Sequence, residues 1–463
     1  MERVREIRGS WCFPALHESL WLSGTLIITP DNEMELDISD FFRGSEEEMQ
    51  KYREMLSAEV VYGSSHDGEP IILYHCYKKF DQLSLPSHYI TASFYVETAL
   101  IGADFSRKEE IRFKKISVAY HYLDNWLGIS GIKLEETSNP YESFKVRYEA
   151  PAPIDIYPKI GIKVRLEVLP RITMGEIPKK EVCIKEKVYL IVEAPGGLSL
   201  EEISRYVFLF QNLFSLLISE PTYPDKIYAS GENGFSPADV EIVFPRTVRR
   251  QELFYAGVAL YPYFRIKDKL KCILENWLEK SEELEPIFNL YFGVIYNSDV
   301  YIEHEFLSFI MALEAYHRRK SRNEEVPQEE HRKRVERILE ASPEEYKKWL
   351  EEKLKYSNEP SLRKRLKEIF DSLADVEYIT QLIPDKKRFI EEVVSTRNYF
   401  IHYDRSLKSK ALEGKALLRA GQKLKIIIEI CLLKKAGFSS EEVDEAVLNS
   451  WKHRHMLTDQ SRN

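Results

Sequence analysis

The sequence has 463 residues, of which 44% are hydrophobic and 30% are charged. That apolar content is enough for packed cores and excludes a wholly disordered chain, and the length predicts two or three domains. The formal charge of −9 excludes a uniformly basic nucleic-acid coat. The charge is unevenly spread: residues 1–300 carry 34 Lys and Arg against 46 Asp and Glu, whereas residues 301–463 carry 32 against 29. We therefore expect the two parts to meet different partners.

The five cysteines stand far apart and form no Cys-x-x-Cys pair. This spacing argues against a zinc site and against a secreted disulfide scaffold. The N-terminus has no apolar stretch behind its charges, and no window approaches 18 uninterrupted apolar residues. We expect a cytoplasmic protein with no membrane span, no bound metal and no cofactor.

From about residue 20 to 195, apolar and polar residues alternate in short runs between turn residues, which is typical of antiparallel strands. The turn Thr29-Pro30-Asp31-Asn32 predicts a hairpin between residues 25–28 and 33–38. With this many strands, two packed sheets or a distorted barrel are expected. Further strands are predicted at 71–77, 89–101, 111–122, 144–149, 161–168 and 187–193.

One helix is predicted near 198–218, where Ser199 and Glu202 have the spacing of a capping box. Its apolar surface is wide, so we expect it to dock on the sheets, and residues 240–244 are predicted to form a later strand. A Pro- and aromatic-rich stretch then marks a domain boundary near residue 268. The expected domains are a β-rich antiparallel sandwich or barrel at 1–268 and an α-helical bundle at 269–463, which makes the fold class α+β multidomain.

Beyond residue 268 the apolar period changes to 3.6 residues, which predicts long helices around 302–316 and 412–432. Ser342 before Pro343 predicts a helix start with Ser342 as its N-cap. Asp385 is predicted to cap a helix that runs through Phe400, and Ser439 is predicted to open the last helix.

The β-rich part contains no pattern that indicates catalysis, because it lacks a phosphate-binding glycine loop, an HExxH motif and a GxSxG motif. Its carboxylate pairs do not indicate a hydrolase without a geometry that the sequence cannot supply. Its scattered histidines are interpreted as structural or solvent-facing. They are His17, His66, His75, His88 and His121.

The helical part contains Arg397-Asn398-Tyr399-Phe400-Ile401-His402 near the end of an apolar-faced helix. No other histidine in the chain has an arginine five positions before it. The bare pattern is weak, since chance readily produces such a match. The structural alternative is a helix-terminal histidine that satisfies the last carbonyls, with the arginine in a surface ion pair.

At these residues the chain resembles the HEPN superfamily, which is defined by an Arg-x4–6-His motif in an α-helical bundle, and within it the ApeA-like proteins of bacterial phage defence. Arg397, Asn398 and His402 match the motif with its shortest spacing, and residues 309–318 resemble the family's first long helix. Residues 9–14 and 23–26, with the hairpins that follow, resemble the β-rich domain that precedes HEPN in ApeA-like chains.

The resemblance implies metal-independent RNA cleavage by a HEPN homodimer, with tRNA among the candidate substrates, in abortive defence started by a phage-derived activator. RNA carries its own nucleophile, the 2′-hydroxyl, so the protein need only move protons and stabilise charge. His402 is the candidate acid-base group, because histidine titrates near neutral pH. Arg397 is the candidate ligand of the scissile phosphate, and Asn398 would orient one of the two.

Five residues turn an α-helix through about 500°, which leaves Arg397 and His402 about 140° apart. Either the helix ends near Ile401 or a second subunit completes the site. Glu314, on the first helix, is a candidate support for either side chain, and a solvated or helix-paired glutamate is the equal alternative.

Weaker candidates for RNA binding lie near the motif and after the first helix. Arg318, Arg319 and Arg322 could track an RNA backbone, although interleaved glutamates favour a solvated charged loop equally. Tyr399 and Tyr403 could stack on a base, although core packing is the commoner use of such residues.

The sequence therefore predicts an endoribonuclease domain that is restrained by an N-terminal sensor domain. The acidic charge of that sensor domain would also repel RNA from the basic part. The main alternative is a non-catalytic HEPN-type binding module. A third hypothesis is a ligand-binding β domain that the helices merely dimerise.

Overall fold

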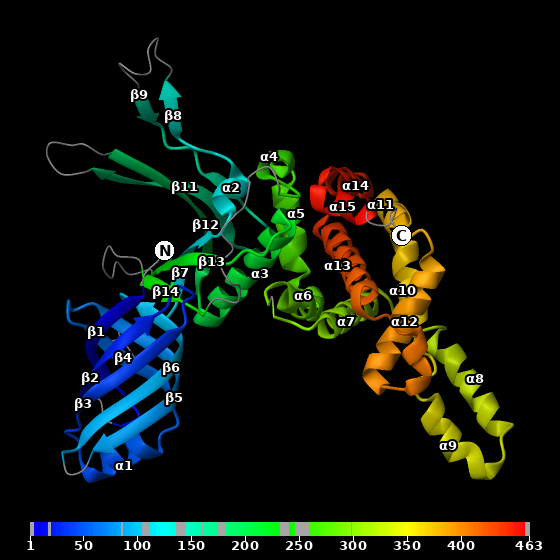
Figure 1. Ribbon diagram of the computed structural model, residues 1–463, viewed down its shortest axis with the longest axis horizontal. Coiled ribbons are helices and arrows are strands. Elements are labelled where there is room, and N and C mark those ends of the chain that lie inside the picture. The colour runs from blue at the N-terminus through cyan, green and yellow to red at the C-terminus, as the bar shows by residue number, and fades with distance from the viewer. Residues whose placement is uncertain are drawn as a thin grey trace. The chain divides into compact units, whose positions relative to one another are not determined.

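The structure is a computed structural model that describes residues 4–16, 20–84, 87–103, 111–135, 145–159, 161–174, 182–231, 240–245, 259–297 and 299–458. The chain separates into two compact units, Met1–Lys271 and Cys272–Asn463. The first unit is built mainly of strands and the second of helices (Figure 1).

Six antiparallel strands of the first unit close into a barrel in the order β6-β3-β2-β1-β4-β5, because β5 pairs along its length with β6. The predicted hairpin is confirmed: Ile28 pairs with Met34, and the Thr29 amide donates to the Glu33 carbonyl at 2.9 Å. The closed sheet confirms the expectation of a barrel-like β domain. Its strands are β1 (Arg5–Cys12), β2 (Trp21–Ile28), β3 (Met34–Phe41), β4 (Ser57–Ser65), β5 (Pro70–Ser84) and β6 (Tyr89–Ile101).

Alternate residues of these strands fill the barrel with apolar side chains, as a period of two requires. Trp11 is fully buried there. Its ring lies so close to Gly63 that a Cβ at position 63 would approach it to 2.2 Å. On β1 itself, a Cβ at Gly9 would meet the Ser64 carbonyl oxygen of β4 at 2.3 Å. The two glycines therefore allow the close packing of β1 on β4.

One end of the barrel carries α1 (Glu46–Glu54), which the sequence analysis missed (Figure 1). Ser45 and Glu48 form a capping box at its start, so the local signal was present. Its buried Tyr52 packs edge-on against Phe13, with ring centroids 5.9 Å apart. This helix therefore closes part of the apolar core rather than standing on the surface.

The sheet continues beyond the barrel through β14, which pairs with β6 on one side and β13 on the other. The predicted helix is present as α3 (Leu200–Ile218), with the capping box of Ser199 and Glu202, and it packs against β7 and β12. The remaining elements of this unit are β7 (Phe113–Tyr120), α2 (Leu123–Leu127), β8 (Ile132–Glu135), β9 (Lys145–Tyr148), β10 (Ile154–Ile156), β11 (Lys163–Met174), β12 (Val182–Leu198), β13 (Pro224–Ser230), β14 (Val240–Val243) and α4 (Tyr263–Ile266).

The helical unit is built around α7 (Ile302–Lys320), which packs against α6, α10, α12 and α13. Its helices are α5 (Leu270–Glu279, which begins at the unit boundary), α6 (Ser281–Ile295), α7, α8 (Gln328–Glu340), α9 (Glu344–Leu354), α10 (Leu362–Ser372), α11 (Glu377–Leu382), α12 (Lys386–His402), the 3-10 helix η2 (Arg405–Lys410), α13 (Gly414–Ala436), α14 (Ser440–Asn449) and α15 (Trp451–Thr458).

Two of the three predicted helix starts are confirmed in this unit. The Asp385 carboxylate accepts from the Arg388 amide at the start of α12, and Ser439 forms a capping box at the start of α14. The predicted N-cap Ser342 is wrong, because Pro343 occupies that position and the Ser342 hydroxyl instead donates to the Ile338 carbonyl at 2.7 Å. The hydroxyl thus satisfies the end of α8 rather than the start of α9.

A buried carboxylate ties α13 to two neighbouring helices. Glu429 accepts a hydrogen bond from the Tyr291 hydroxyl at 2.6 Å and lies 3.8 Å from both Lys425 and His453. Burial alone would raise its pKa, but these three groups together lower the pKa of Glu429 to about 2. The last helix, α15, is therefore held through His453 to a carboxylate that is ionised at neutral pH.

Replacing Gly9 by Ala should destabilise the barrel by about 1–3 kcal/mol, because the new methyl group meets the Ser64 carbonyl. Urea unfolding followed by tryptophan fluorescence measures this free energy. Gly196→Ala is the matched control, since nothing lies within 4 Å of a Cβ built there. Equal stability of the two variants would contradict the packing described for β1 and β4.

Replacing Glu429 by Gln tests the buried carboxylate. Because the folded pKa is below the unfolded value, ionised Glu429 stabilises the protein above about pH 4.5, and this stabilisation is lost as the pH falls toward about 2. Thermal unfolding should show a lower Tm for Glu429→Gln at pH 7 and a difference that narrows toward pH 3. A difference independent of pH would count against an ionised Glu429.

Candidate functional site

The Arg-x4-His motif lies on the last turns of α12, and both of its side chains belong to one continuous helix. The helix runs through His402 and ends because Tyr403 adopts a left-handed conformation with φ of 49°. Arg397 and His402 therefore lie about 140° apart around the helix axis. The helix thus ends one residue beyond Ile401, as one of the two arrangements considered from the sequence expected, but both side chains still belong to helical residues, and a single α12 does not bring them together.

Arg397 is half-buried and has few partners. Its Nη1 donates to the Asn398 side-chain oxygen at 3.2 Å, and its Nη2 lies 4.0 Å from Glu314 Oε2. The part of the chain that the structure describes offers this guanidinium no other acceptor. Several of its N–H groups therefore remain available to an incoming anion.

His402 is exposed at the C-terminal end of α12. Its charge contributes, after the Ser406 amide and hydroxyl, to the lowering of the Asp404 pKa. Tyr399 and Tyr403 pack edge-to-face, with ring centroids 5.8 Å apart, and Tyr403 is 70% exposed. An imidazole and an aromatic ring are thus presented together where the helix ends.

Glu314, the predicted support, lies on α7 and faces three arginines. Its Oε1 lies 3.5 Å from Arg318 and 3.9 Å from Nε of Arg365, and its Oε2 lies 4.0 Å from Arg397. Glu359 pairs with two of these three arginines, at 3.1 Å from Arg318 and 3.5 Å from Arg365. Two carboxylates therefore balance the charge that surrounds Arg397.

Arg365 of α10, which the sequence analysis missed, is the buried centre of this network. Its side chain is 1% exposed, and burial, followed by the nearby charge of Arg318, lowers its pKa. Its Nε has no hydrogen-bond partner among the described residues. Arg365 falls on the same stripe as the buried Leu366, Ile369 and Phe370, and this placement of a charge on an apolar face was the available signal.

The same arginine contacts His317, which is buried on α7. Arg365 Nη1 lies 3.3 Å from His317 Nδ1, and a guanidinium can only donate, so Nδ1 accepts. Nε2 of the same ring lies 2.5 Å from Glu368 Oε2 and donates to that carboxylate. His317 therefore joins α7 to α10 and is not available as an acid or base at the surface.

The remaining basic candidates separate into two groups. Arg318 is engaged by Glu314 and Glu359, so it belongs to the buried network more than to a free basic surface. Arg319 and Arg322 are exposed and form no ion pair within the described residues. Among those residues there is also no cluster of His, Cys, Asp or Glu that could hold a metal ion, and no helix is long and apolar enough to cross a membrane.

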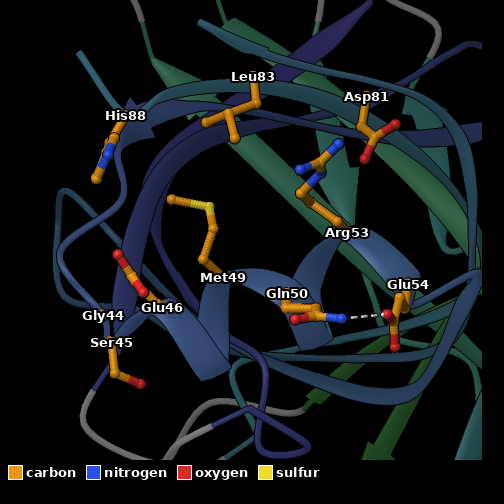
Figure 2. A pocket seen from close by; sticks show the side chains of 10 residues that line it. All are labelled: Gly44, Ser45, Glu46, Met49, Gln50, Arg53, Glu54, Asp81, Leu83 and His88. Atoms are coloured by element: carbon orange, nitrogen blue, oxygen red, sulfur yellow. Dashed lines mark hydrogen bonds between the residues drawn. The ribbon is translucent and has the colours of Figure 1, made fainter. Parts of the chain in front are cut away.

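The end of the barrel holds a pocket of about 750 Å³ between α1 and the end of β5, which includes His88 from the sequence analysis (Figure 2). Gln50 donates to Glu54 at 2.9 Å, and Lys78 lies 3.3 Å from Asp81. Arg53 adds a cation to the same opening. The charged side chains around this pocket are of both signs and are partly paired with one another, so they select no single class of ligand. Of the other predicted histidines, His66, His75 and His121 belong to this first unit, whereas α12 belongs to the second, and His17 lies outside the described residues.

Arg365→Met should destabilise the helical unit by about 1–3 kcal/mol, because it removes the buried cation that Glu314 and Glu359 share and the donor to His317 Nδ1. Arg363→Met is the matched control on the same helix: Arg363 is half exposed and pairs with Glu391 at 3.0 Å, so its loss should cost less than about 1 kcal/mol. Urea unfolding of both variants measures the difference. Similar losses for the two would contradict a central role of Arg365.

Comparison with protein-family models identifies both parts of the chain. The ApeA N-terminal domain 1 model matches residues 6–277, and the Apea-like HEPN model matches residues 307–442, which include Glu314, Arg365, Arg397 and His402. No curated protein and no solved structure matches the chain significantly. Because the first model alone covers more than half of the sequence, the chain belongs to the ApeA family, with a β-rich ApeA N-terminal domain followed by an Apea-like HEPN domain.

Proposed function

We propose that this protein is a metal-independent endoribonuclease whose HEPN domain cuts RNA through Arg397, Asn398 and His402. The observation that carries the proposal is the state of Arg397: its guanidinium lies beside a balanced charge network, keeps N–H groups free, and belongs to an Arg-x4-His motif inside the HEPN match. A phosphate, like a carboxylate, matches the planar fork of such a group.

The chemistry assigns one role to each side chain. The 2′-oxygen attacks the adjacent phosphorus while its proton passes to a base, and the bond to the 5′-oxygen breaks as that oxygen takes up a proton. His402 moves these protons, because an imidazole can both accept and donate a proton. Arg397 stabilises the negative charge that grows on the phosphorane, and Asn398 holds the guanidinium in place. The products are a 2′,3′-cyclic phosphate and a 5′-hydroxyl.

A homodimer completes the site in this proposal. The angle of about 140° between the two side chains on α12 keeps Arg397 and His402 of one copy from acting on the same phosphate. A second copy related by a two-fold axis would place its own α12 against the first. The His402 of one copy would then act beside the Arg397 of the other.

The wider role follows from the family. The ApeA-like HEPN family is associated with phage defence, so we place this chain in an abortive-infection response in the cytoplasm. Residues 1–268 would act as the sensor or restraining domain, and residues 269–463 as the nuclease. tRNA is the first candidate substrate, and a phage-derived molecule is the candidate activator. Arg319, Arg322 and Tyr403 are exposed and are the candidates for contacts with the RNA chain.

A non-catalytic binding module remains the second candidate function. The observation in its favour is that the imidazole of His402 has no hydrogen-bond partner within the described part of the chain, so no residue of the same copy orients it. Under this alternative, changes at His402 alter binding without affecting any bond cleavage.

Purified full-length protein should cut total RNA or tRNA in excess EDTA, and His402→Ala should lower the cleavage rate at least about a hundredfold through the loss of acid-base catalysis. Mapping of the new 3′ ends should find 2′,3′-cyclic phosphates. The reaction is repeated with phage-infected lysate to supply an activator.

His304→Ala is the matched control, since it removes another imidazole from the helical unit outside the motif. It should cut RNA as the wild type does. Binding of RNA without cleavage, with or without lysate, would favour the binding module.

A further inference from the structure

A second hollow in the first unit, of about 590 Å³, is lined by aromatic rings and carboxylates. It lies where β5, β6, the first turns of α3 and the segment after β14 meet. In contrast to the pocket at the barrel end, no lysine or arginine among the residues that the structure describes lines it. The six side chains that carry the argument are Tyr74, Tyr95, Phe208, Phe244, Glu97 and Glu201.

The regular elements fix these groups around the hollow. Tyr95 and Glu97 are two residues apart on β6, so they leave the same face of the strand. Glu201 and Phe208 are seven residues apart on α3, so they lie on one side of that helix, away from the buried Ile203 and Val207. The site is thus built on rigid elements of one unit.

The two carboxylates face the hollow without a partner. Neither Glu97 nor Glu201 makes a hydrogen bond or an ion pair within the described residues. Burial, followed by the charge of Glu97, raises the pKa of Tyr95, because the carboxylate lies close to that ring. Two carboxylates therefore stand beside aromatic rings, and the unit that bears them is itself acidic.

Aromatic faces and carboxylates attract the same kind of ligand. The face of an aromatic ring carries partial negative charge, so it attracts an organic cation placed over it. A carboxylate adds a charge-assisted hydrogen bond to an ammonium or guanidinium group. Anions are disfavoured by both features, and a purely apolar ligand would leave both carboxylates desolvated and unpaired.

We infer that this aromatic and acidic hollow binds an organic cation, the guanidinium or alkylammonium side chain of an arginine or lysine presented by a polypeptide. The hollow is open and larger than one such side chain requires, so it leaves room for the residues on either side. This inference concerns binding by the first unit and does not depend on RNA cleavage.

The test is binding of a fluorescent peptide Ser-Gly-Arg-Gly-Ser to the full chain, with the lysine peptide beside it. The citrulline and norleucine peptides are controls that keep the shape of each side chain and remove its charge. The double variant E97Q/E201Q and the variant Tyr95→Ala should each weaken binding of the charged peptides by about tenfold or more. The variant Glu69→Gln, an exposed glutamate outside the hollow, should bind as the wild type does.

Two further measurements separate the outcomes. Circular dichroism melting of each variant shows whether a loss of peptide binding is caused by unfolding. Arginine amide tests whether a small free cation binds the hollow. If arginine amide competes at the same concentration as the peptide, the result would support the cation site and would indicate a small molecule, rather than a polypeptide, as the source of the bound cation. Equal binding of arginine and citrulline peptides, unchanged binding by E97Q/E201Q, or no binding of any cation up to millimolar concentration would overturn the inference.

Discussion

The burial of one arginine is the constraint on which the helical unit depends. Arg365 carries a full positive charge with 1% of its side chain exposed, and such a charge is tolerated only where carboxylates meet it. Glu314 and Glu359 do so, and His317 accepts one of its N–H groups. These partners come from α7 and from the segment before α10, so the network sets how the two helices pack. Glu314 extends the same network to Arg397 of α12.

This arrangement explains how the guanidinium of Arg397 is held in position while several of its N–H groups remain available to other acceptors. A lone arginine on a surface helix would move or pair with a neighbour, whereas Arg397 is set against Asn398 and faces Glu314 at a distance too long for a hydrogen bond. The carboxylate attracts the guanidinium and leaves its N–H groups to other acceptors. A phosphate that binds Arg397 would break few existing hydrogen bonds and would form new ones with the available N–H groups. The proposed cleavage needs this property.

The sequence predicted the fold to the extent that its signals were local. Alternation of side chains and the Thr29–Asn32 turn predicted strands, and the capping boxes at Ser199 and Ser439 predicted two helix starts. Closure of the barrel depends on pairing of β5 with β6 and of β1 with β4, and no local pattern reports a pairing between distant strands. The first helix, α1, was missed because it is short and polar on most of its surface.

The same holds for the candidate site: residues that are close together in the sequence were predicted, and residues that meet only in the folded chain were not. Arg397, Asn398 and His402 were found because they are close in sequence, and Glu314 because it stands on a recognisable helix. Arg365 and Glu359 were not found, since their significance comes from burial against α7, 40 to 50 residues away in the chain. A contact between the α12 helices of two copies would be a property of an assembly, and no local pattern within one chain predicts such a contact.

The most direct test of the account mixes two inactive variants, Arg397→Ala and His402→Ala, and measures RNA cleavage in EDTA. If a site uses Arg397 of one copy and His402 of the other, each mixed dimer regains one intact site, and the mixture should cut RNA although neither variant does alone. A mixture that stays as inactive as its components, while wild-type protein cuts, would contradict a site shared between two copies.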